Sequence, residues 1–258
     1  MLHLKKEAQP LKEEEFRLRT CPVCSGYVCH VYFMRDAVTK KESKWFSCSC
    51  GVVFNEKAPQ MVYDKKYWDR NNEFCNKVRP AYEYVVRIYA PVIEELLYGR
   101  KVLLIGKQNP YQEDAFRERG WVSYSIDKNI DLEVKDRIIQ GDFETYDFHP
   151  DLKFGMIWMY HTFECLNDPL KSLLKMKSML DEDGILFIAS PDTDFIHTRG
   201  SASFRHWKPD MHNMMWNKRA LTRQLENLGF NIIMSRNNCW DRFPETDDFH
   251  IIAQRKFF

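Results

Sequence analysis

Four cysteines lie in two closely spaced pairs near the start of the chain. Cys21 and Cys24 form a CxxC pair, and Cys48 and Cys50 form a CxC pair that is followed by glycine. Thiolates from two such turns can surround a zinc ion tetrahedrally, and the metal then replaces the core that so short a segment cannot build. Because four sulfur ligands leave no coordination position open, the pattern predicts a structural zinc site rather than a catalytic one.

Two other interpretations of these cysteines stay open. Cys29 and His30 lie between the pairs and are alternative ligands, although the alternation of Val28–Phe33 favours a strand that carries them. The four cysteines could also be reduced thiols without a metal. No apolar signal segment opens the sequence, and clustered cysteines in such a chain are typical of a cytoplasmic metal site rather than of a disulfide framework.

A histidine and a glutamate follow directly after the most apolar segment of the chain. Phe154–Tyr160 (FGMIWMY) has the composition of a strand that is buried on both faces, and His161 and Glu164 come next. Ligands of open parallel sheets bind at the carboxyl ends of the strands. Since the pKa of histidine suits proton removal, we expect His161 to act as a base and Glu164 to orient it or to bind the acceptor.

Further histidines occur in residues 192–216, a long segment that we expect to be irregular and to cover the substrate as a lid. His206 is the next candidate for a catalytic role, together with His212. The competing interpretations are that His161 caps a helix or fills the core, and that the long segment is surface irregularity. A hydrolase using Cys165 with His161 fits the residue types, but the two lie too close in sequence for us to favour it.

Small or acidic residues follow three further predicted strands. A glycine ends Val102–Ile105, an aspartate ends Trp121–Ile126, and Gly-Asp-Phe follows Arg137–Gln140. In a nucleotide-binding half-sheet, the first acid accepts hydrogen bonds from a ribose. The second acid could take the amino group of a base, and the phenylalanine ring could pack on its face, although an ordinary turn is the alternative. The candidate cofactor contacts in these turns are Gly106, Lys107, Gln108, Asp127, Asp142 and Phe143.

The strands alternate with segments of helical periodicity. Helices are expected over Asn76–Tyr98, which Pro91 should kink or split, over Tyr111–Arg119 and Pro169–Leu180, and from Asn217 to Gly229. Further strands are expected at Gly184–Ser190, Phe230–Met234 and His250–Ala253. This order predicts an α/β fold with a mostly parallel sheet.

The charge balance and hydropathy of the 258 residues limit the partners. The formal net charge is +1, so the total gives no electrostatic support for nucleic-acid binding. No apolar run approaches the length of a membrane span, so we expect no membrane partner. A protein partner stays open.

Several of these segments together resemble the class I S-adenosylmethionine-dependent methyltransferases. HTFECLNDP is similar to the family's H-x-x-E-H-x-x-D-P stretch, with Cys165 in place of the second histidine, and DEDGILFIASP is similar to K-P-G-G-x-L-x-I-x-x-P. CPVC…CSCGVVF followed by YDKKYW resembles the zinc-ribbon front end of a subset that often acts on sugars or small metabolites. Leu104, Gln108 and Pro110 depart from the family pattern, which has an acid and glycines there.

The resemblance implies a Rossmann-like, seven-stranded, mostly parallel sheet with an antiparallel last strand, plus a small N-terminal zinc ribbon. It divides the chain into a charged arm (1–20), a zinc ribbon (21–58), a linker with lead-in helices (59–100) and a methyltransferase-like domain (101–258). The implied cofactor is S-adenosylmethionine, with Met159 and Tyr160 beside its methionine part, and the implied acceptor is a sugar or other small molecule. The alternative is a non-catalytic scaffold with this fold, favoured by the altered loop after Gly106.

Overall fold

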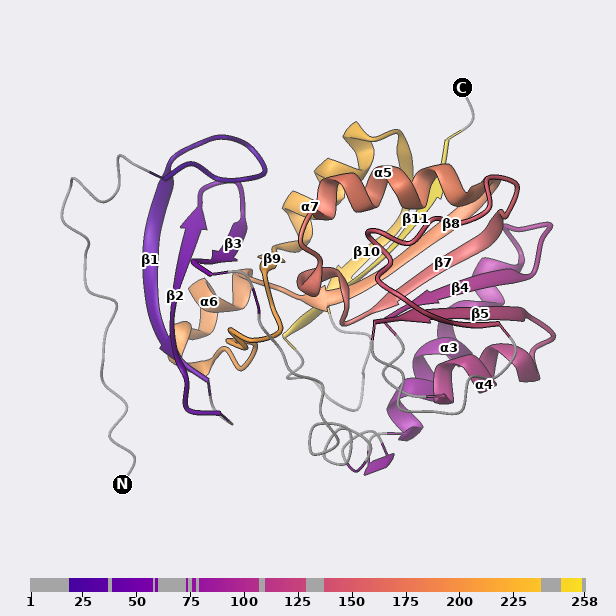
Figure 1. The fold of residues 1–258 in the computed structure, drawn as a ribbon, viewed down its shortest axis with the longest axis horizontal. Helices are drawn as coiled ribbons and strands as arrows, with labels where there is room; N and C mark the ends of the chain where they lie inside the picture. The colour runs from indigo at the N-terminus through magenta and orange to yellow at the C-terminus, as the bar shows by residue number, and fades with distance from the viewer. Residues whose placement is uncertain are drawn as a thin grey trace.

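The chain folds into two sheets that lie side by side (Figure 1). The computed structural model describes residues 19–36, 39–57, 59, 73, 76, 77, 79–106, 110–128, 137–237 and 247–256. Most of the expected N-terminal arm and much of the expected linker lie outside these ranges.

The larger sheet has seven strands in the order β10-β11-β8-β7-β4-β5-β6. Neighbouring strands are parallel except at β11, which runs antiparallel to both β8 and β10. The mostly parallel, Rossmann-like sheet with a reversed last strand is therefore confirmed. The strands are β4 (Lys101–Ile105), β5 (Val122–Asp127), β6 (Ile138–Gln140), β7 (Phe154–Tyr160), β8 (Leu180–Pro191), β10 (Phe230–Asn237) and β11 (Asp248–Arg255).

Helices cover both faces of this sheet, as Figure 1 shows. Helices α3 (Arg79–Glu94) and α4 (Tyr111–Glu118) lie on one face, and α5 (Pro169–Met179) and α7 (Lys218–Asn227) lie on the other. The side chains of β4 alternate accordingly, so that Val102 and Leu104 pack with α3 and α4, whereas Leu103 and Ile105 pack with α5 and α7. Burial on both faces explains why these strands are continuous apolar runs.

Capping residues fix the starts of two helices as expected. The side chain of Asp168 accepts a hydrogen bond from the backbone N–H of Lys171 at the start of α5, and Asn217 accepts one from Ala220 at the start of α7. Pro91 was expected to kink or split the helix that contains it. Helix α3 is not split, because it runs through Pro91 to Glu94 as one element.

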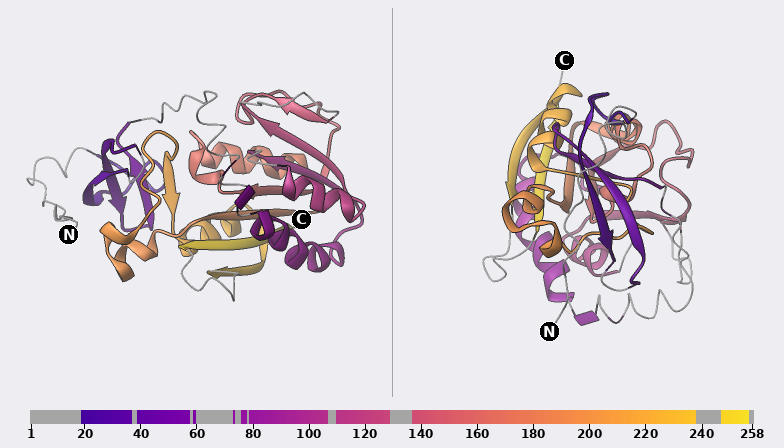
Figure 2. Two further views of the ribbon diagram at one scale, coloured as in Figure 1. Left: turned by 90° about the horizontal axis from the view of Figure 1, so that it is seen from below. Right: turned by 90° about the vertical axis from the view of Figure 1, so that its left-hand side faces the viewer.

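The smaller sheet contains the strand predicted around Val28–Phe33, two further N-terminal strands and one strand from far along the chain. Strands β1 (Val28–Arg35), β2 (Glu42–Cys48) and β3 (Val52–Asn55) form an antiparallel meander. Strand β9 (Met214–Trp216) then pairs antiparallel with β3. Figure 2 shows β9 beside the N-terminal strands from a second direction. The segment that we expected to be irregular thus completes the N-terminal sheet.

Residues 192–216 hold further regular structure that packs on this sheet. They contain α6 (Asp194–Arg199) and the 3-10 helix η2 (Ser201–Ser203), besides β9. The ring of Trp207 lies 5.4 Å from that of Tyr32 and 5.5 Å from that of Trp45, measured between centroids. Because the segment forms two helices and a strand and packs on the small sheet, the expectation that it is irregular is wrong.

No helix within the described ranges combines the length and the apolar composition that crossing a membrane requires.

Candidate functional site

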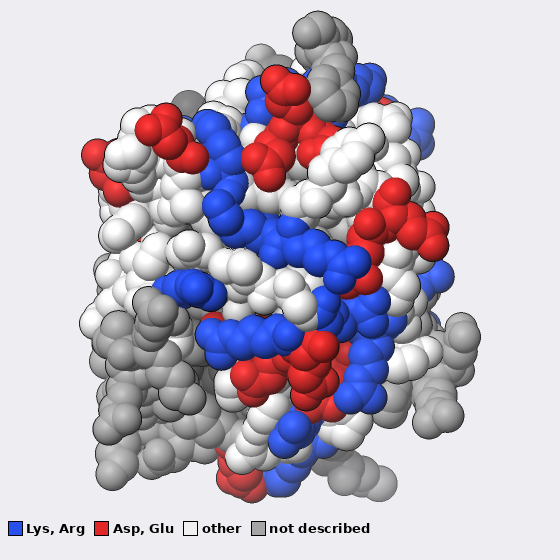
Figure 3. All heavy atoms as spheres, turned by 90° about the vertical axis from the view of Figure 1, so that its right-hand side faces the viewer, with Lys and Arg blue, Asp and Glu red and all other residues white. Residues whose placement is uncertain are grey.

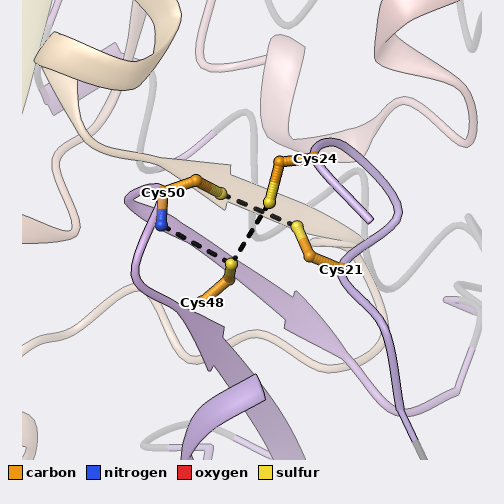
Figure 4. Close-up of side chains that lie close together, drawn as sticks. All are labelled: Cys21, Cys24, Cys48 and Cys50. Carbon is orange, nitrogen blue, oxygen red and sulfur yellow. Dashed lines mark hydrogen bonds between the residues drawn. The ribbon is translucent and has the colours of Figure 1, made fainter. Parts of the chain in front are cut away.

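The four paired cysteines converge on one point, as Figure 4 shows. The sulfur atoms of Cys21 and Cys50 are 3.7 Å apart, those of Cys24 and Cys48 are 3.5 Å apart, and all four lie within 4.8 Å of one another. Zinc–sulfur bonds of about 2.3 Å in a tetrahedron place the sulfurs about 3.8 Å apart, so the spacing fits a zinc ion. Cys29 lies outside this group, with its thiol on the carbonyl of Tyr27.

Backbone amides and neighbouring thiols surround these sulfur atoms. The N–H of Val23 donates to Cys21 at 3.4 Å, and the N–H of Cys50 donates to Cys48 at 3.5 Å. The thiol of Cys50 lowers the pKa of Cys21 to about 5, while the same contact raises the pKa of Cys50. The group therefore already favours a thiolate, which is the form that binds metal.

Gly106 begins the turn after β4, where the chain approaches another loop closely. Its φ is +77°, and a Cβ placed there would lie 2.2 Å from Oγ1 of Thr162. The N–H of Gly106 donates to the carbonyl of Ile126 in β5. Only glycine tolerates both the positive φ and this contact without strain.

The two candidate acids lie on the adjoining turns of the same edge. Asp127 ends β5, and its carbonyl accepts a hydrogen bond from Gly141 after β6. One carboxylate oxygen of Asp142 lies 2.9 Å from Nζ of Lys128, and the other accepts from the N–H of Glu144. Both oxygens of Asp142 are thus engaged by the chain itself.

The remaining predicted cofactor contacts are core residues or lie outside the described ranges. Phe143 is buried in the main core, with Nζ of Lys175 5.0 Å from the centre of its ring, which is not the open face expected for holding a base. Met159 is fully buried, and Tyr160 packs edge-on against Tyr82. Lys107 and Gln108 lie outside the described residues.

His161 lies between two carboxylates at the carboxyl end of β7. Its Nδ1 is 3.5 Å from Oε1 of Glu164, and its Nε2 is 3.4 Å from Oδ2 of Asp248. His161 has a φ of +52°, and its N–H donates to the carbonyl of Ala189 in β8. The positive φ, which a residue other than glycine rarely adopts, turns the chain sharply at this edge.

Two histidines from residues 192–216 join the same group. The ring of His206 stacks on that of His161 at 5.9 Å between centroids, and its Nε2 is 3.5 Å from Oδ1 of Asp248. Nε2 of His212 is 3.8 Å from Oε1 of Glu164. The structure therefore brings the predicted His161, Glu164 and His206 together with His212, as one cluster.

The pKa values within this cluster diverge because burial and charge act in opposite directions. Burial lowers the pKa of His161, but Asp248 and Glu164 outweigh it and raise the pKa to about 10. Burial raises the pKa of Glu164, yet the surrounding histidines, mainly His161, bring it down to about 2. Burial dominates at His206 and lowers its pKa to about 3. At neutral pH, His161 is thus a cation held by carboxylates, and His206 is the neutral imidazole.

Comparisons with known proteins show the family to which this geometry belongs. A family model described as a methyltransferase domain matches residues 82–235, more than half of the chain. The chain belongs to this methyltransferase domain family. No curated protein matches the sequence.

Solved structures share the fold of this methyltransferase domain at low sequence identity. A SAM-dependent methyltransferase from Archaeoglobus fulgidus is 20% identical, with a TM-score of 0.56 over 74% of this chain and 100% of that one. A Burkholderia thailandensis 1,6-didemethyltoxoflavin-N1-methyltransferase, solved with S-adenosylhomocysteine, is 10% identical, with a TM-score of 0.52 over 83% and 99%. A structure of a Haloferax volcanii complex of the Trm112 methyltransferase activator and a putative methyltransferase matches at 14% identity, with a TM-score of 0.55 over 76% and 100%.

Sequence reasoning missed Asp248 in the methyltransferase domain, although it completes the histidine cluster. We expected the last strand at His250–Ala253 and assigned the acids before it to a turn. Strand β11 begins at Asp248, and the antiparallel register pairs Asp248 with Pro191 at the end of β8. A last strand that runs antiparallel starts at the edge where the parallel strands end. The residues just before the predicted last strand, including Asp248, could therefore have been placed at the site by this rule.

Proposed function

We propose that the chain is an S-adenosylmethionine-dependent methyltransferase that acts on a sugar or another small-molecule acceptor. The observation that carries the proposal is the joint placement of Gly106, Asp127 and Asp142 on the sheet edge that also carries the His161 cluster. Open α/β sheets bind their ligands at this edge. The Burkholderia neighbour, which was solved with the small molecule 1,6-didemethyltoxoflavin bound, supports an acceptor of that kind.

The residues on this edge fit the cofactor. Gly106 has no side chain to obstruct a ligand, and the half-buried Asp127 can accept hydrogen bonds from ribose hydroxyls. Asp142 can accept the amino group of a base once Lys128 moves away from it. When bound, S-adenosylmethionine supplies an electrophilic methyl group, and the chain has to orient the acceptor and take up its proton.

The histidine cluster supplies the proton acceptor. His206 is the neutral imidazole but a weak base, so it, rather than the charged His161, takes the proton of an acceptor hydroxyl as the oxygen gains the methyl group and becomes strongly acidic. Asp248, 3.5 Å from Nε2 of His206, stabilises the imidazolium that forms. Glu164 and His161 hold Asp248 and the surrounding rings in place.

A nucleic-acid acceptor has no electrostatic support. The net charge is +1, and on the face drawn in Figure 3 basic and acidic side chains lie intermingled. Nucleic-acid sites present a basic surface of one sign. A protein partner is compatible with the Haloferax neighbour, whose title names an activator protein.

We infer a structural zinc ion at Cys21, Cys24, Cys48 and Cys50. The sulfur separations of 3.5 and 3.7 Å support it, because they agree with the edges of a zinc tetrahedron. A tetrathiolate site of this kind is typical of a reducing compartment, so we infer a cytoplasmic location.

Calorimetric titration with S-adenosylmethionine and S-adenosylhomocysteine tests the enzymatic function. We expect micromolar binding of both ligands, abolished by Asp127→Ala and retained by Asp151→Ala, an exposed acid on another loop. Both variants should keep the far-ultraviolet circular dichroism of the wild type. A folded wild-type chain that binds neither ligand would instead support a non-catalytic scaffold.

A further inference from the structure

Buried polar atoms in the histidine cluster have no hydrogen-bond partner among the described residues. They include Oε1 of Glu164, Nε2 of His206 and Oδ1 of Asp248. The side chain of Glu164 is fully buried, and that of Asp248 is 10% exposed. Each such atom destabilises the fold when it loses water without gaining a partner. Nε2 of His206 and Oδ1 of Asp248 lie 3.5 Å apart without a hydrogen bond, next to Nε2 of His161, and this arrangement indicates an occupant between the three residues.

The separations of these atoms fit an ion better than they fit hydrogen bonds. Nε2 of His161 is 3.4 Å from Oδ2 of Asp248, and Nε2 of His206 is 3.5 Å from Oδ1 of Asp248. An N–H···O hydrogen bond spans about 2.7–3.2 Å. Ligand atoms about 2.0–2.2 Å from a tetrahedral metal lie about 3.3–3.6 Å apart. One ligand atom from each of the three residues lies within 4.8 Å of the others.

The surroundings of His161 resemble those of a metal-binding histidine. Such a histidine donates its other ring N–H to a carboxylate, which fixes the tautomer. Nδ1 of His161 faces Oε1 of Glu164 at 3.5 Å, and Oε2 of Glu164 accepts a hydrogen bond from the hydroxyl of Ser190 at 2.9 Å. With the remaining ring proton on Nδ1, the lone pair of Nε2 faces Asp248 and His206, so a bound ion replaces the second proton that His161 carries in the ion-free chain.

We propose that His161, His206 and Asp248 bind a divalent transition-metal ion, separate from the zinc at the four cysteines. Imidazole and carboxylate ligands suit zinc, and three protein ligands leave a coordination position open. Building on the proposed methyltransferase function, this position binds the hydroxyl oxygen of the acceptor. His206 then holds the ion instead of receiving the proton. The ion would acidify the bound hydroxyl, which would release its proton to solvent water as its oxygen takes the methyl group from the sulfonium sulfur.

Cobalt loading tests this site without any cofactor. The probe is Co²⁺ added to the full-length chain after metal removal, with ions per chain counted by mass spectrometry. We expect two ions per chain in the wild type and one in Asp248→Asn. The cobalt ion at the four cysteines has an intense sulfur-to-cobalt charge-transfer absorption, and this absorption should be unchanged in Asp248→Asn. Asp151→Asn is the matched control and should bind two ions.

The wild-type count decides the proposal even if Asp248→Asn fails to fold, and His206→Gln provides a second variant. A wild-type chain that binds one cobalt ion, at the four cysteines, would overturn the proposal. A folded Asp248→Asn chain that keeps two ions would overturn it as well. Cofactor titration is independent of this count. A chain with the second ion but no cofactor binding would refute the methyltransferase function alone, and the reverse result would refute the second metal site alone.

Discussion

Replacing Cys24 by serine should destabilise the chain by removing one of four zinc ligands. Cys24 is exposed, so the substitution leaves no cavity in the core, and the loss measures metal binding. Structural zinc in zinc-finger peptides is worth about 10–16 kcal/mol, and losing a quarter of it costs about 2.5–4 kcal/mol. At about 2–4 °C per kcal/mol for a chain of this size, we expect the melting temperature to fall by about 5–16 °C.

Cys29→Ser is the matched control, because Cys29 is also exposed and lies outside the sulfur cluster. The assay is thermal unfolding followed by circular dichroism, combined with the zinc content of each protein. A chelator should lower the melting temperature of the wild type and of Cys29→Ser, and should lower that of Cys24→Ser by a smaller amount, because part of its zinc affinity is already lost. If both variants melt within about 2 °C of each other, or if the wild type contains no zinc, the reasoning is refuted.

Two further perturbations test other contacts. Lys128→Met should release the carboxylate of Asp142 from an exposed ion pair worth about 0.2–1 kcal/mol. The affinity for S-adenosylhomocysteine, measured by calorimetry, should therefore rise by up to about fivefold. A weaker affinity in the variant would contradict the role of Asp142. Glu94→Gln should lower the free energy of unfolding, measured in urea at neutral pH, by about 2 kcal/mol. The reason is that Glu94 accepts hydrogen bonds from Arg119 at 2.8 and 2.7 Å and from Trp121 at 2.9 Å. Since the Arg119 contact lowers the pKa of Glu94, the difference in free energy of unfolding between the wild type and the variant should become smaller as the pH falls below about 4.3. A difference that does not change with pH would refute the role of the charge.

Local patterns were sufficient to predict the larger sheet. Val102–Ile105 and Phe154–Tyr160 are apolar throughout because helices cover both faces, and this composition identifies a central strand without knowledge of its neighbours. Asp168 and Asn217 were recognisable because a cap is set by residues within one helical turn. Strand β9 carries no such signal. Its three residues pair with β3, far away in sequence, and long-range packing alone selects that partner.

The candidate site likewise contains residues whose placement follows from local spacing and residues whose placement depends on the whole sheet. The cysteine pairs and the residues just past the strand ends were found because their chemistry depends on local spacing. The role of Phe143 stays a prediction, because an aromatic side chain after a strand suits both a cofactor face and a core, and in the structure it is buried beside Lys175. Asp248 was missed because its place in the cluster depends on the reversed direction of β11, a property of the whole sheet.

The small sheet carries the proposed zinc site, and it also holds the loop that supplies His206 and His212. Nδ2 of Asn55 in β3 donates to the carbonyl of Pro209 at 2.9 Å and to that of His212 at 3.3 Å, both within this loop. Trp207, next to His206, packs on Trp45 in β2. The cysteines close the turns that order β2 and β3, so a zinc ion there would position the histidines at the edge of the larger sheet. This coupling gives the N-terminal sheet a part in assembling the site, and it accounts for a strand that joins it from so far along the chain.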